Sequence, residues 1–345
     1  MAHKVLHKEA HARYVVSFQK DKKGYEYVAS EYLRLSGIYW GTTALMLLTT
    51  KEEEYKEKDK NNNNPTTQFV DYTKGLSADE VVADVLECRN ADGGFASAPG
   101  HDSHLLYTLS AVQVLCNYDR LHKELSEEQR RETAKWVASL QSEEDGSFKG
   151  DKWGEVDTRF SYCASSCLRL LGFGPELGDI IDVEKAVSFV LSCRNFDEGF
   201  GARPGDETHA GQVFCCVGAL ALLDALDRVD ADRLAWWLCE RQTEGGGLNG
   251  RPQKKQDVCY TWWVLSSLSM LGRLHWVDRT ALVAFILSCQ DPEEGGISDR
   301  PDDEVDVFHT FFGIAGLSLL KYPGLSEVNA KYAMPQRVIE KMGLA

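Results

Sequence analysis

Three residues in the last third of the chain have side chains that could hold one metal ion. Asp257 and Cys259 stand two residues apart at the start of an apolar run, and His309 follows much later. A carboxylate oxygen, a thiolate sulfur and an imidazole nitrogen are all zinc ligands, and three protein ligands leave a fourth position open, as in catalytic sites. By themselves the three residues equally fit a helix-capping aspartate, a core cysteine and a hydrogen-bonded histidine.

A cationic segment directly before this pair could bind an anion. Arg251, Lys254 and Lys255 cluster in a chain of formal net charge −15, and the start of a helix also favours negative charge. A solvated surface loop is the alternative interpretation. Three further residues could donate to the same anion: Arg159, His209 and Tyr260.

Aromatic residues are frequent in the neighbouring apolar runs. The candidates for an aromatic wall are Tyr39, Trp40, Tyr107, Phe160, Tyr162, Phe214, Trp262, Trp263, Phe311 and Phe312. A basic mouth above such a wall is typical of a site for a ligand with an anionic head and an apolar tail.

These residues are placed by an internal repeat. Five Gly-rich turns, each followed by a hydrophobic anchor, recur at intervals of about 50 residues, with the anchors at Phe95, Phe148, Phe200, Leu248 and Ile297. The runs before and after each turn have apolar residues at steps of three and four, which predicts helices. Residues 31–48 resemble a degenerate sixth unit. The sequence therefore predicts an all-α fold of about six helical hairpins, closed into an α/α toroid with inner and outer rings.

Nine residues after each anchor the chain places an ionisable side chain: His104, Asp157, His209, Asp257 and Asp306. In a closed ring these positions share one rim, together with Arg159, Cys259 and His309, which lie two or three residues further on. Helix capping explains the three aspartates but does not account for His104, His209, Cys259 or His309. We therefore predict a functional rim.

Composition narrows the class of protein. The strong negative charge argues against nucleic-acid binding, and no stretch is long and apolar enough to cross a bilayer. No secretion signal is evident at the start, and the ten cysteines are expected to be reduced, with all but Cys259 buried in the core, so a cytoplasmic location is expected. Residues 1–345 are expected to form one domain, with a disordered polar insertion at 51–67.

The sequence resembles the β-subunits of the protein prenyltransferases, and within them the Rab, or type II, geranylgeranyltransferase branch. The resemblance covers about residues 25–320. It is carried by residues 30–41, 100–111, 153–161, 192–197, 236–242 and 247–252, and by Asp257-Val258-Cys259-Tyr260-Thr261-Trp262-Trp263 and Phe308-His309-Thr310. The insertion at 51–67 is longer than the family pattern suggests.

The resemblance implies a catalytic Zn²⁺ on Asp257, Cys259 and His309. It also implies that His209, Arg251, Lys254 and Tyr260 hold the diphosphate of a lipid donor, and that the lipid is lined by Trp40, Ala210, Gly211, Thr261, Trp262 and Trp263. At two positions where farnesyl-specific relatives carry bulky aromatics this chain has Ser36 and Leu109. The extra room predicts geranylgeranyl diphosphate as donor. Asp299 could assist a Mg²⁺ ion on the diphosphate.

The implied reaction is attack of a substrate cysteine thiolate on C1 of geranylgeranyl diphosphate. The implied partners are a prenyltransferase α-subunit, a Rab escort protein and Rab GTPase substrates. The alternatives are a type I geranylgeranyl- or farnesyltransferase β-subunit, a glycosidase with facing carboxylates, or a non-catalytic toroid. A terpene cyclase is disfavoured because the chain lacks an Asp-x-Asp-Asp motif.

Overall fold

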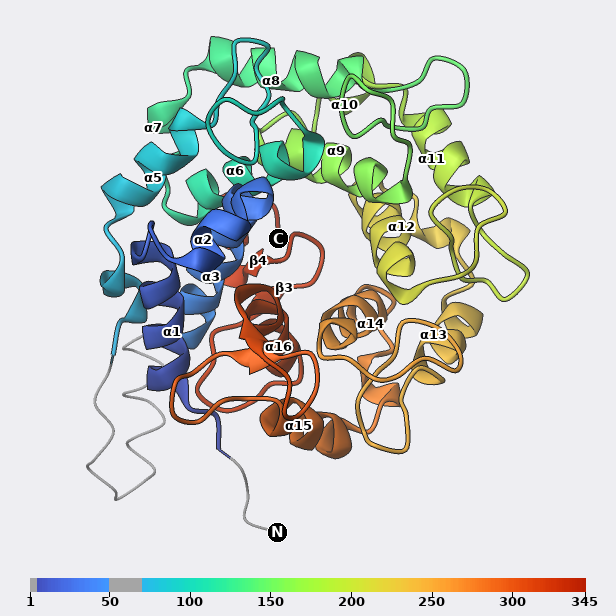
Figure 1. Ribbon diagram of the computed structural model, residues 1–345. Coiled ribbons are helices and arrows are strands. Elements are labelled where there is room, and N and C mark those ends of the chain that lie inside the picture. The colour runs from blue at the N-terminus through green and yellow to red at the C-terminus, as the bar shows by residue number, and fades with distance from the viewer. Residues whose placement is uncertain (1–4, 50–69) are drawn as a thin grey trace.

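Two concentric rings of helices surround a central axis in the computed structural model, which describes residues 5–49 and 70–345 (Figure 1). The inner ring consists of α3 (Arg34–Leu48), α6 (Leu105–Asn117), α9 (Thr158–Leu170), α12 (Ala210–Leu222), α14 (Cys259–Met270) and α16 (Val307–Leu319). The outer ring consists of α1 (Lys8–Lys20), α5 (Ala78–Glu87), α8 (Glu127–Ser139), α11 (Val183–Ser192), α13 (Ala231–Cys239) and α15 (Arg279–Ser288). Each inner helix contacts the next, and α3 contacts both α6 and α16, so the ring is closed. The predicted α/α toroid of six hairpins is confirmed.

The Gly-rich turns join each outer helix to the inner helix that follows it. All five predicted anchors, Phe95, Phe148, Phe200, Leu248 and Ile297, are fully buried. Each of them pairs with a residue just after the preceding outer helix through a single antiparallel bridge. The outer helices α5, α8, α11, α13 and α15 start at Ser or Asp caps whose side chains accept a backbone N–H. Local capping and one buried anchor per turn therefore fix the geometry of every hairpin.

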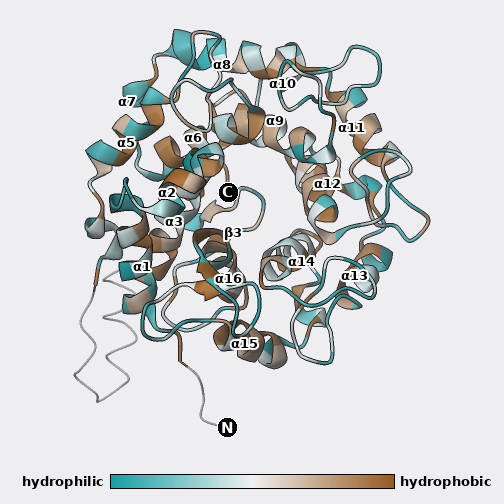
Figure 2. Cartoon of the chain, in the orientation of Figure 1, coloured by the Kyte–Doolittle hydropathy of each residue, from teal (hydrophilic) through white to brown (hydrophobic). Residues whose placement is uncertain are grey.

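The two rings differ in how they bury their side chains. The inner helix α3 is buried along nearly its whole length, whereas the outer helix α5 buries only one face, through Val81, Val82 and Val85. Figure 2 shows hydrophobic residues concentrated on the inner helices and hydrophilic residues on the connecting loops. The inner helices are thus apolar nearly all round, as expected for helices that lie between an outer layer and an apolar centre.

Short elements complete the chain. They are α2 (Tyr25–Ala29), α7 (Leu121–Glu124), α10 (Leu177–Ile180), α17 (Gln336–Lys341) and the 3₁₀ turns η1 (Glu31–Leu33), η2 (Tyr72–Gly75), η3 (Leu226–Arg228) and η4 (Leu274–Trp276). Two antiparallel ribbons pair β1 (Ile297–Ser298) with β2 (Val305–Asp306), and β3 (Val328–Asn329) with β4 (Met334–Pro335). The β3–β4 ribbon lies beside the C-terminal ends of α14 and α16, at the opposite end of the ring from the turn loops.

Several sequence expectations concern the whole chain. Nine of the ten cysteines are buried; Cys239 is partly exposed, because it is the last residue of the outer helix α13, so the expectation of burial was wrong for it. No helix within residues 5–49 and 70–345 has the length and apolar character needed to cross a membrane. The predicted insertion at 51–67 lies outside the described residues.

Candidate active site

Asp257, Cys259 and His309 meet at the rim of the ring. One ligand atom from each lies within 4.8 Å of the other two, and His309 Nε2 is 3.3 Å from Asp257 Oδ1. Asp257 precedes α14, Cys259 is the first residue of α14, and His309 is on the first turn of the adjacent helix α16. The two helix starts therefore bring an oxygen, a sulfur and a nitrogen together, as the repeat arithmetic predicts.

A fourth residue fixes the orientation of the imidazole. Asp306 caps α16 by accepting the backbone N–H of His309, and its second oxygen lies 2.6 Å from His309 Nδ1. Burial alone would lower the pKa of His309, but the hydrogen bonds and charges of Asp257 and Asp306 outweigh it and raise that pKa to about 9. Because a carboxylate holds Nδ1, Nε2 of His309 faces Asp257 and Cys259. This arrangement is typical of a metal-ligating histidine.

The electrostatics of the three residues fit a divalent cation. Burial, together with the nearby Asp257, raises the pKa of the Cys259 thiol far above its usual range. Burial opposes ionisation of Asp257 as well, yet hydrogen bonds from His309 and Cys259 lower its pKa. A buried thiol beside a carboxylate ionises only when a cation compensates the charge, and zinc bound by Asp, Cys and His would do so with one coordination position left open.

All five rim residues accept a backbone N–H at the start of an inner helix, the two histidines included. His104 accepts the N–H of Leu106 through Nδ1, and His209 accepts the N–H of Gly211 in the same way. Asp157 caps α9, and Asp257, one residue before the cap position of α14, accepts the N–H of Cys259. The expectation that capping does not explain the histidines was therefore wrong, because an imidazole nitrogen can replace the usual carboxylate or hydroxyl oxygen. Nε2 of a capping histidine remains available for a second hydrogen bond, as in His209.

A cationic mouth of about 540 Å³ opens beside the triad. It is lined by His209, Arg251, Lys254, Lys255, Asp257, Tyr260 and Arg300. Arg251 also pairs with Glu207 at the surface. Since four of these side chains are positively charged and one is acidic, the mouth suits a polyanion such as a diphosphate.

His209 and Tyr260 form a short hydrogen-bonded chain in this mouth. Because His209 Nδ1 accepts from Gly211, its proton lies on Nε2, which donates to the Tyr260 hydroxyl at 3.1 Å. Burial raises the pKa of Tyr260 to about 12, so its hydroxyl keeps its proton at neutral pH. Burial and the charge of Arg251 lower the pKa of His209. Both groups are therefore neutral hydrogen-bond donors, and the Tyr260 proton is free to point at an anion.

A second cavity, of about 510 Å³, lies in the centre of the ring below this mouth. Eight of the ten predicted wall aromatics line it: Tyr39, Trp40, Tyr107, Tyr162, Phe214, Trp262, Trp263 and Phe312. Ser36, Leu109, His209 and Gly211 line it too. Phe160 and Phe311 are fully buried and lie behind the cavity wall. The cavity is thus a mainly apolar pocket that opens at a cationic rim.

Two predicted lining residues face elsewhere. Thr261 is fully buried and packs against α16, where a side chain at Gly316 would meet the Thr261 methyl. Ala210 is fully buried and donates its backbone N–H to Gly250. Neither lines the cavity. The rotation of each inner helix about its axis decides this, and that rotation is set by packing between neighbouring helices.

The sequence matches a known protein family over nearly its whole length. The family model of the prenyltransferase alpha-alpha toroid domain matches residues 6–334. The geranylgeranyl transferase type-2 subunit beta of Saccharomyces cerevisiae is 49% identical over 340 residues, with 97% of this chain and 96% of the relative covered. The chain belongs to the protein prenyltransferase β-subunit family. The geranylgeranyl transferase type-2 subunit beta 1 of Arabidopsis thaliana is also 49% identical, over 97% of this chain and 94% of its own.

Solved structures agree on the fold of this family. The protein geranylgeranyltransferase-I of Candida albicans, solved in complex with GGPP, superposes with a TM-score of 0.80 at 20% identity, covering 98% of both chains. A type II terpene cyclase from Scytonema has a TM-score of 0.57 at 11% identity, covering 91% of this chain and 97% of the cyclase. At these identities the likeness concerns the toroid alone.

Sequence reasoning overlooked two residues of the prenyltransferase site. Arg300 lines the cationic mouth, and Phe308 lines the central cavity. Arg300 follows its turn anchor by three residues, as Arg251 follows Leu248. The repeat arithmetic applied at that position would have found it. Lys255, which belongs to the basic cluster of the sequence analysis but not to the diphosphate residues that the resemblance implies, lines the mouth as well.

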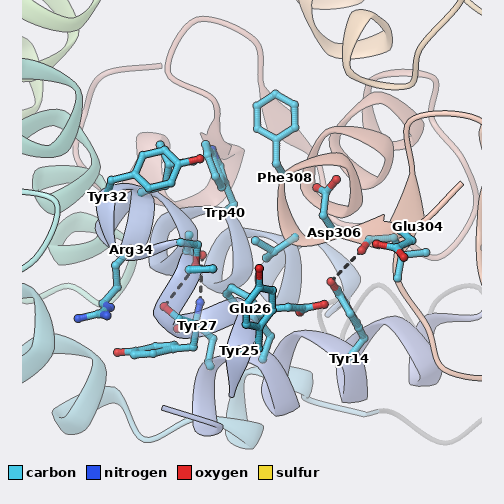
Figure 3. Close-up of a pocket in the computed structure, with 18 residues that line it drawn as sticks. Tyr14, Tyr25, Glu26, Tyr27, Tyr32, Arg34, Trp40, Glu304, Asp306 and Phe308 are labelled. Atoms are coloured by element: carbon cyan, nitrogen blue, oxygen red, sulfur yellow. Dashed lines mark hydrogen bonds between the residues drawn. The ribbon is translucent and has the colours of Figure 1, made fainter. Parts of the chain in front are cut away.

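An open groove of about 410 Å³ adjoins the central cavity on the side of α1 and α2 (Figure 3). It shares Trp40 and Phe308 with the cavity, and several tyrosines contribute to its lining. Tyr14 donates to the carbonyl of Val305 at 3.4 Å within it. The groove extends the apolar surface from the cavity to the outer rim beside Asp306.

Proposed function

We propose that this chain is the catalytic β-subunit of a Rab-type, or type II, protein geranylgeranyltransferase. The observation that carries the proposal is the juxtaposition of the Asp257–Cys259–His309 triad, the cationic mouth and the apolar central cavity. The type-2 relatives that are 49% identical over nearly their full length support this assignment within the family.

Asp257, Cys259 and His309 would hold one Zn²⁺, and Asp306 would keep His309 in its ligating tautomer. When bound, zinc supplies the Lewis acidity that keeps a substrate thiol ionised near neutral pH. The substrate is the C-terminal cysteine of a Rab GTPase. Its sulfur forms a bond to C1 of geranylgeranyl diphosphate as the C1–O bond breaks, and the bonding electrons leave with the diphosphate.

The residues of the mouth stabilise that leaving group. Arg251, Lys254 and the Tyr260 hydroxyl are positioned where negative charge grows on the diphosphate, and His209 holds the Tyr260 hydroxyl in place. Pre-oriented donors of this kind lower the barrier because they need no reorganisation during the reaction. The scheme needs no protein nucleophile and no general base.

The donor's tail occupies the central cavity, against Trp40, Trp262 and Trp263. Ser36 and Leu109, both on the wall, leave room for a twenty-carbon chain, and each further buried CH₂ contributes about 0.8 kcal/mol. Asp299 is the residue expected to assist a Mg²⁺ ion on the diphosphate. Its carboxylate pairs with Arg300 at 2.9 Å, so a magnesium ion at that position would have to break this ion pair.

The partners follow from the same assignment: a prenyltransferase α-subunit in a heterodimer, and a Rab escort protein that presents the Rab substrate. The test is to copurify the chain with the α-subunit, measure its zinc, and assay geranylgeranyl transfer to a Rab with and without escort protein. We expect one zinc per chain and transfer that requires both partners. Cys259→Ala should lose zinc and transfer together, whereas Cys239→Ala, on the outer ring, should keep both.

Each alternative gives a different result in this assay. Transfer to a C-terminal peptide without escort protein would indicate a type I or farnesyl enzyme. Stable protein that holds neither zinc nor isoprenoid diphosphate would indicate a non-catalytic toroid. Full activity of metal-free protein would refute the zinc scheme.

A further inference from the structure

The deep end of the central cavity is closed by the loop between β3 and β4. Three consecutive backbone carbonyls of this loop accept hydrogen bonds from three different inner helices. Tyr39 on α3 donates to the carbonyl of Ala333 at 2.6 Å. Gln113 on α6 donates to Tyr332 at 2.9 Å, and Tyr162 on α9 donates to Lys331 at 3.0 Å. The loop is thus held in place by hydrogen bonds from three neighbouring inner helices.

These contacts lie far from the catalytic rim. Along α6 the residues that line the cavity run from Leu106, near the rim, to Gln113. At 1.5 Å per residue, Gln113 lies about 10 Å deeper than Leu106. The loop that Gln113 holds therefore forms the floor of the cavity rather than part of its mouth.

Ala333 is the one residue of the loop 330–333 that lines the cavity. It is nearly fully buried, and its φ of +54° lies in the left-handed region. For a residue other than glycine this conformation costs about 1 kcal/mol, and here the backbone is held in it by Tyr39 and by a bond from its own N–H to Asn329. The floor thus presents a single methyl group on a fixed backbone.

The same hydrogen bonds make the floor apolar. Tyr39, Gln113 and Tyr162 all line the cavity, and the polar end of each side chain donates a proton to a loop carbonyl. Polar groups that are paired in this way do not have to be desolvated again when a hydrocarbon chain arrives. The deep end therefore suits the last isoprene unit of a lipid tail.

We propose that Ala333 sets the longest isoprenoid that the cavity accepts, by forming its floor; this inference rests on the proposed function. Ser36 and Leu109 shape the wall at intermediate depth, whereas Ala333 limits the total depth. A larger side chain at 333 would remove the space of the terminal five-carbon unit, and glycine would deepen the cavity.

The test measures binding of isoprenoid diphosphates to the full-length chain through the fluorescence of the cavity tryptophans. Ala333→Leu should weaken the binding of geranylgeranyl diphosphate by at least about tenfold. The affinity for the shorter farnesyl diphosphate should stay within about twofold of that of the wild type. Ala333→Gly, which also relieves the left-handed strain, should improve binding of the twenty-five-carbon geranylfarnesyl diphosphate. Ala333→Asn is a second bulky variant, because asparagine tolerates positive φ.

Ala330→Leu is the matched control. Ala330 is in the same loop but lines a separate pocket beside the ends of α14 and α16, so its replacement should leave the preference among the three donors unchanged. Wild-type protein that binds geranylgeranyl diphosphate, with Ala333 variants of unchanged preference, would overturn this inference alone. Wild-type protein that binds no isoprenoid diphosphate would overturn the proposed function as well.

Discussion

Among single residues, Asp306 supports the triad although it is not one of its three members. It caps α16 with one oxygen and orients His309 with the other. Partners that hold the far nitrogen of a ligating histidine fix its tautomer and raise its basicity. If the triad holds zinc as proposed, its affinity for the metal depends on a residue that contributes no ligand atom.

Asp306→Asn should lower zinc affinity by about 10- to 100-fold, since an amide holds the imidazole less strongly than a carboxylate. Competition with a chelator measures this directly. The thermal unfolding midpoint should change little, because asparagine also caps helices well. Asp157→Asn, at the equivalent cap of α9, should leave zinc affinity unchanged; equal losses in the two variants would contradict the role given to Asp306.

Ser36 and Leu109 provide a second test of individual residues. Both line the cavity, and the Ser36 hydroxyl lies 3.2 Å from that of Ser110. Ser36→Trp combined with Leu109→Tyr should shift the donor preference from geranylgeranyl to farnesyl diphosphate, because the added rings narrow the cavity above its floor and reduce the room for the longer chain. The ratio of kcat/KM for the two donors checks this. An unchanged ratio would reject the cavity-size explanation.

At the level of elements, the loop that carries Arg251, Lys254 and Lys255 is held in place by contact with two helices. The carbonyl of Gly250 accepts the N–H of Ala210 at the start of α12. A Cβ at Gly250 would approach the Tyr260 ring of α14 to 2.4 Å. Only glycine therefore lets the loop reach its position between the two helix starts.

Gly250→Ala should displace either the loop or the Tyr260 ring, and so reduce transfer by about tenfold or more, as small misplacements in active sites do. Zinc content should be unchanged, since the triad does not touch Gly250. Gly178→Ala is the control, because a Cβ there meets no atom within 4 Å. Loss of zinc in Gly250→Ala would show that the substitution disturbs the rim as a whole.

For the molecule as a whole, closing the ring depends on joining its first helix to its last hairpin. His11 of α1 is fully buried; its Nδ1 accepts the N–H of Gly296 at 2.9 Å, and its Nε2 lies 3.1 Å from Gln290 Oε1. Burial lowers the pKa of His11 to about 4, against opposing effects from Gln290 and Asp291. The neutral imidazole therefore connects residues nearly three hundred positions apart.

Stability should fall as His11 becomes protonated in the unfolded chain. Above the ordinary histidine pKa of about 6.5, His11 makes its full contribution to the free energy of unfolding. As the pH falls from there to about 4, the free energy of unfolding decreases by about 3 kcal/mol in total. Unfolding by urea across this range measures the effect. His11→Gln should be less stable at pH 7 but should lack this part of the pH dependence; an identical pH profile in both proteins would contradict the assignment.

Much of the fold was readable from the sequence because the repeat is regular. Five anchors about 50 residues apart predicted the hairpins, and positions counted from them predicted a shared rim that holds Asp257 and His309. The same counting would have found Arg300. Capping by His104 and His209 was missed because sequence preference for caps rests on oxygen-bearing side chains.

The sequence by itself determined the helices, the turns and which polar residues lie at the rim of the ring, because these depend on local spacing and capping. Only the tertiary structure decided which side of each inner helix faces the centre. Those helices are buried all round, so their apolar pattern does not distinguish the cavity side, toward Trp262, from the side on which Thr261 packs against α16. The floor at Ala333 likewise arises only when the closed ring brings α3, α6 and α9 to one loop, because contacts so distant in sequence leave no local signal.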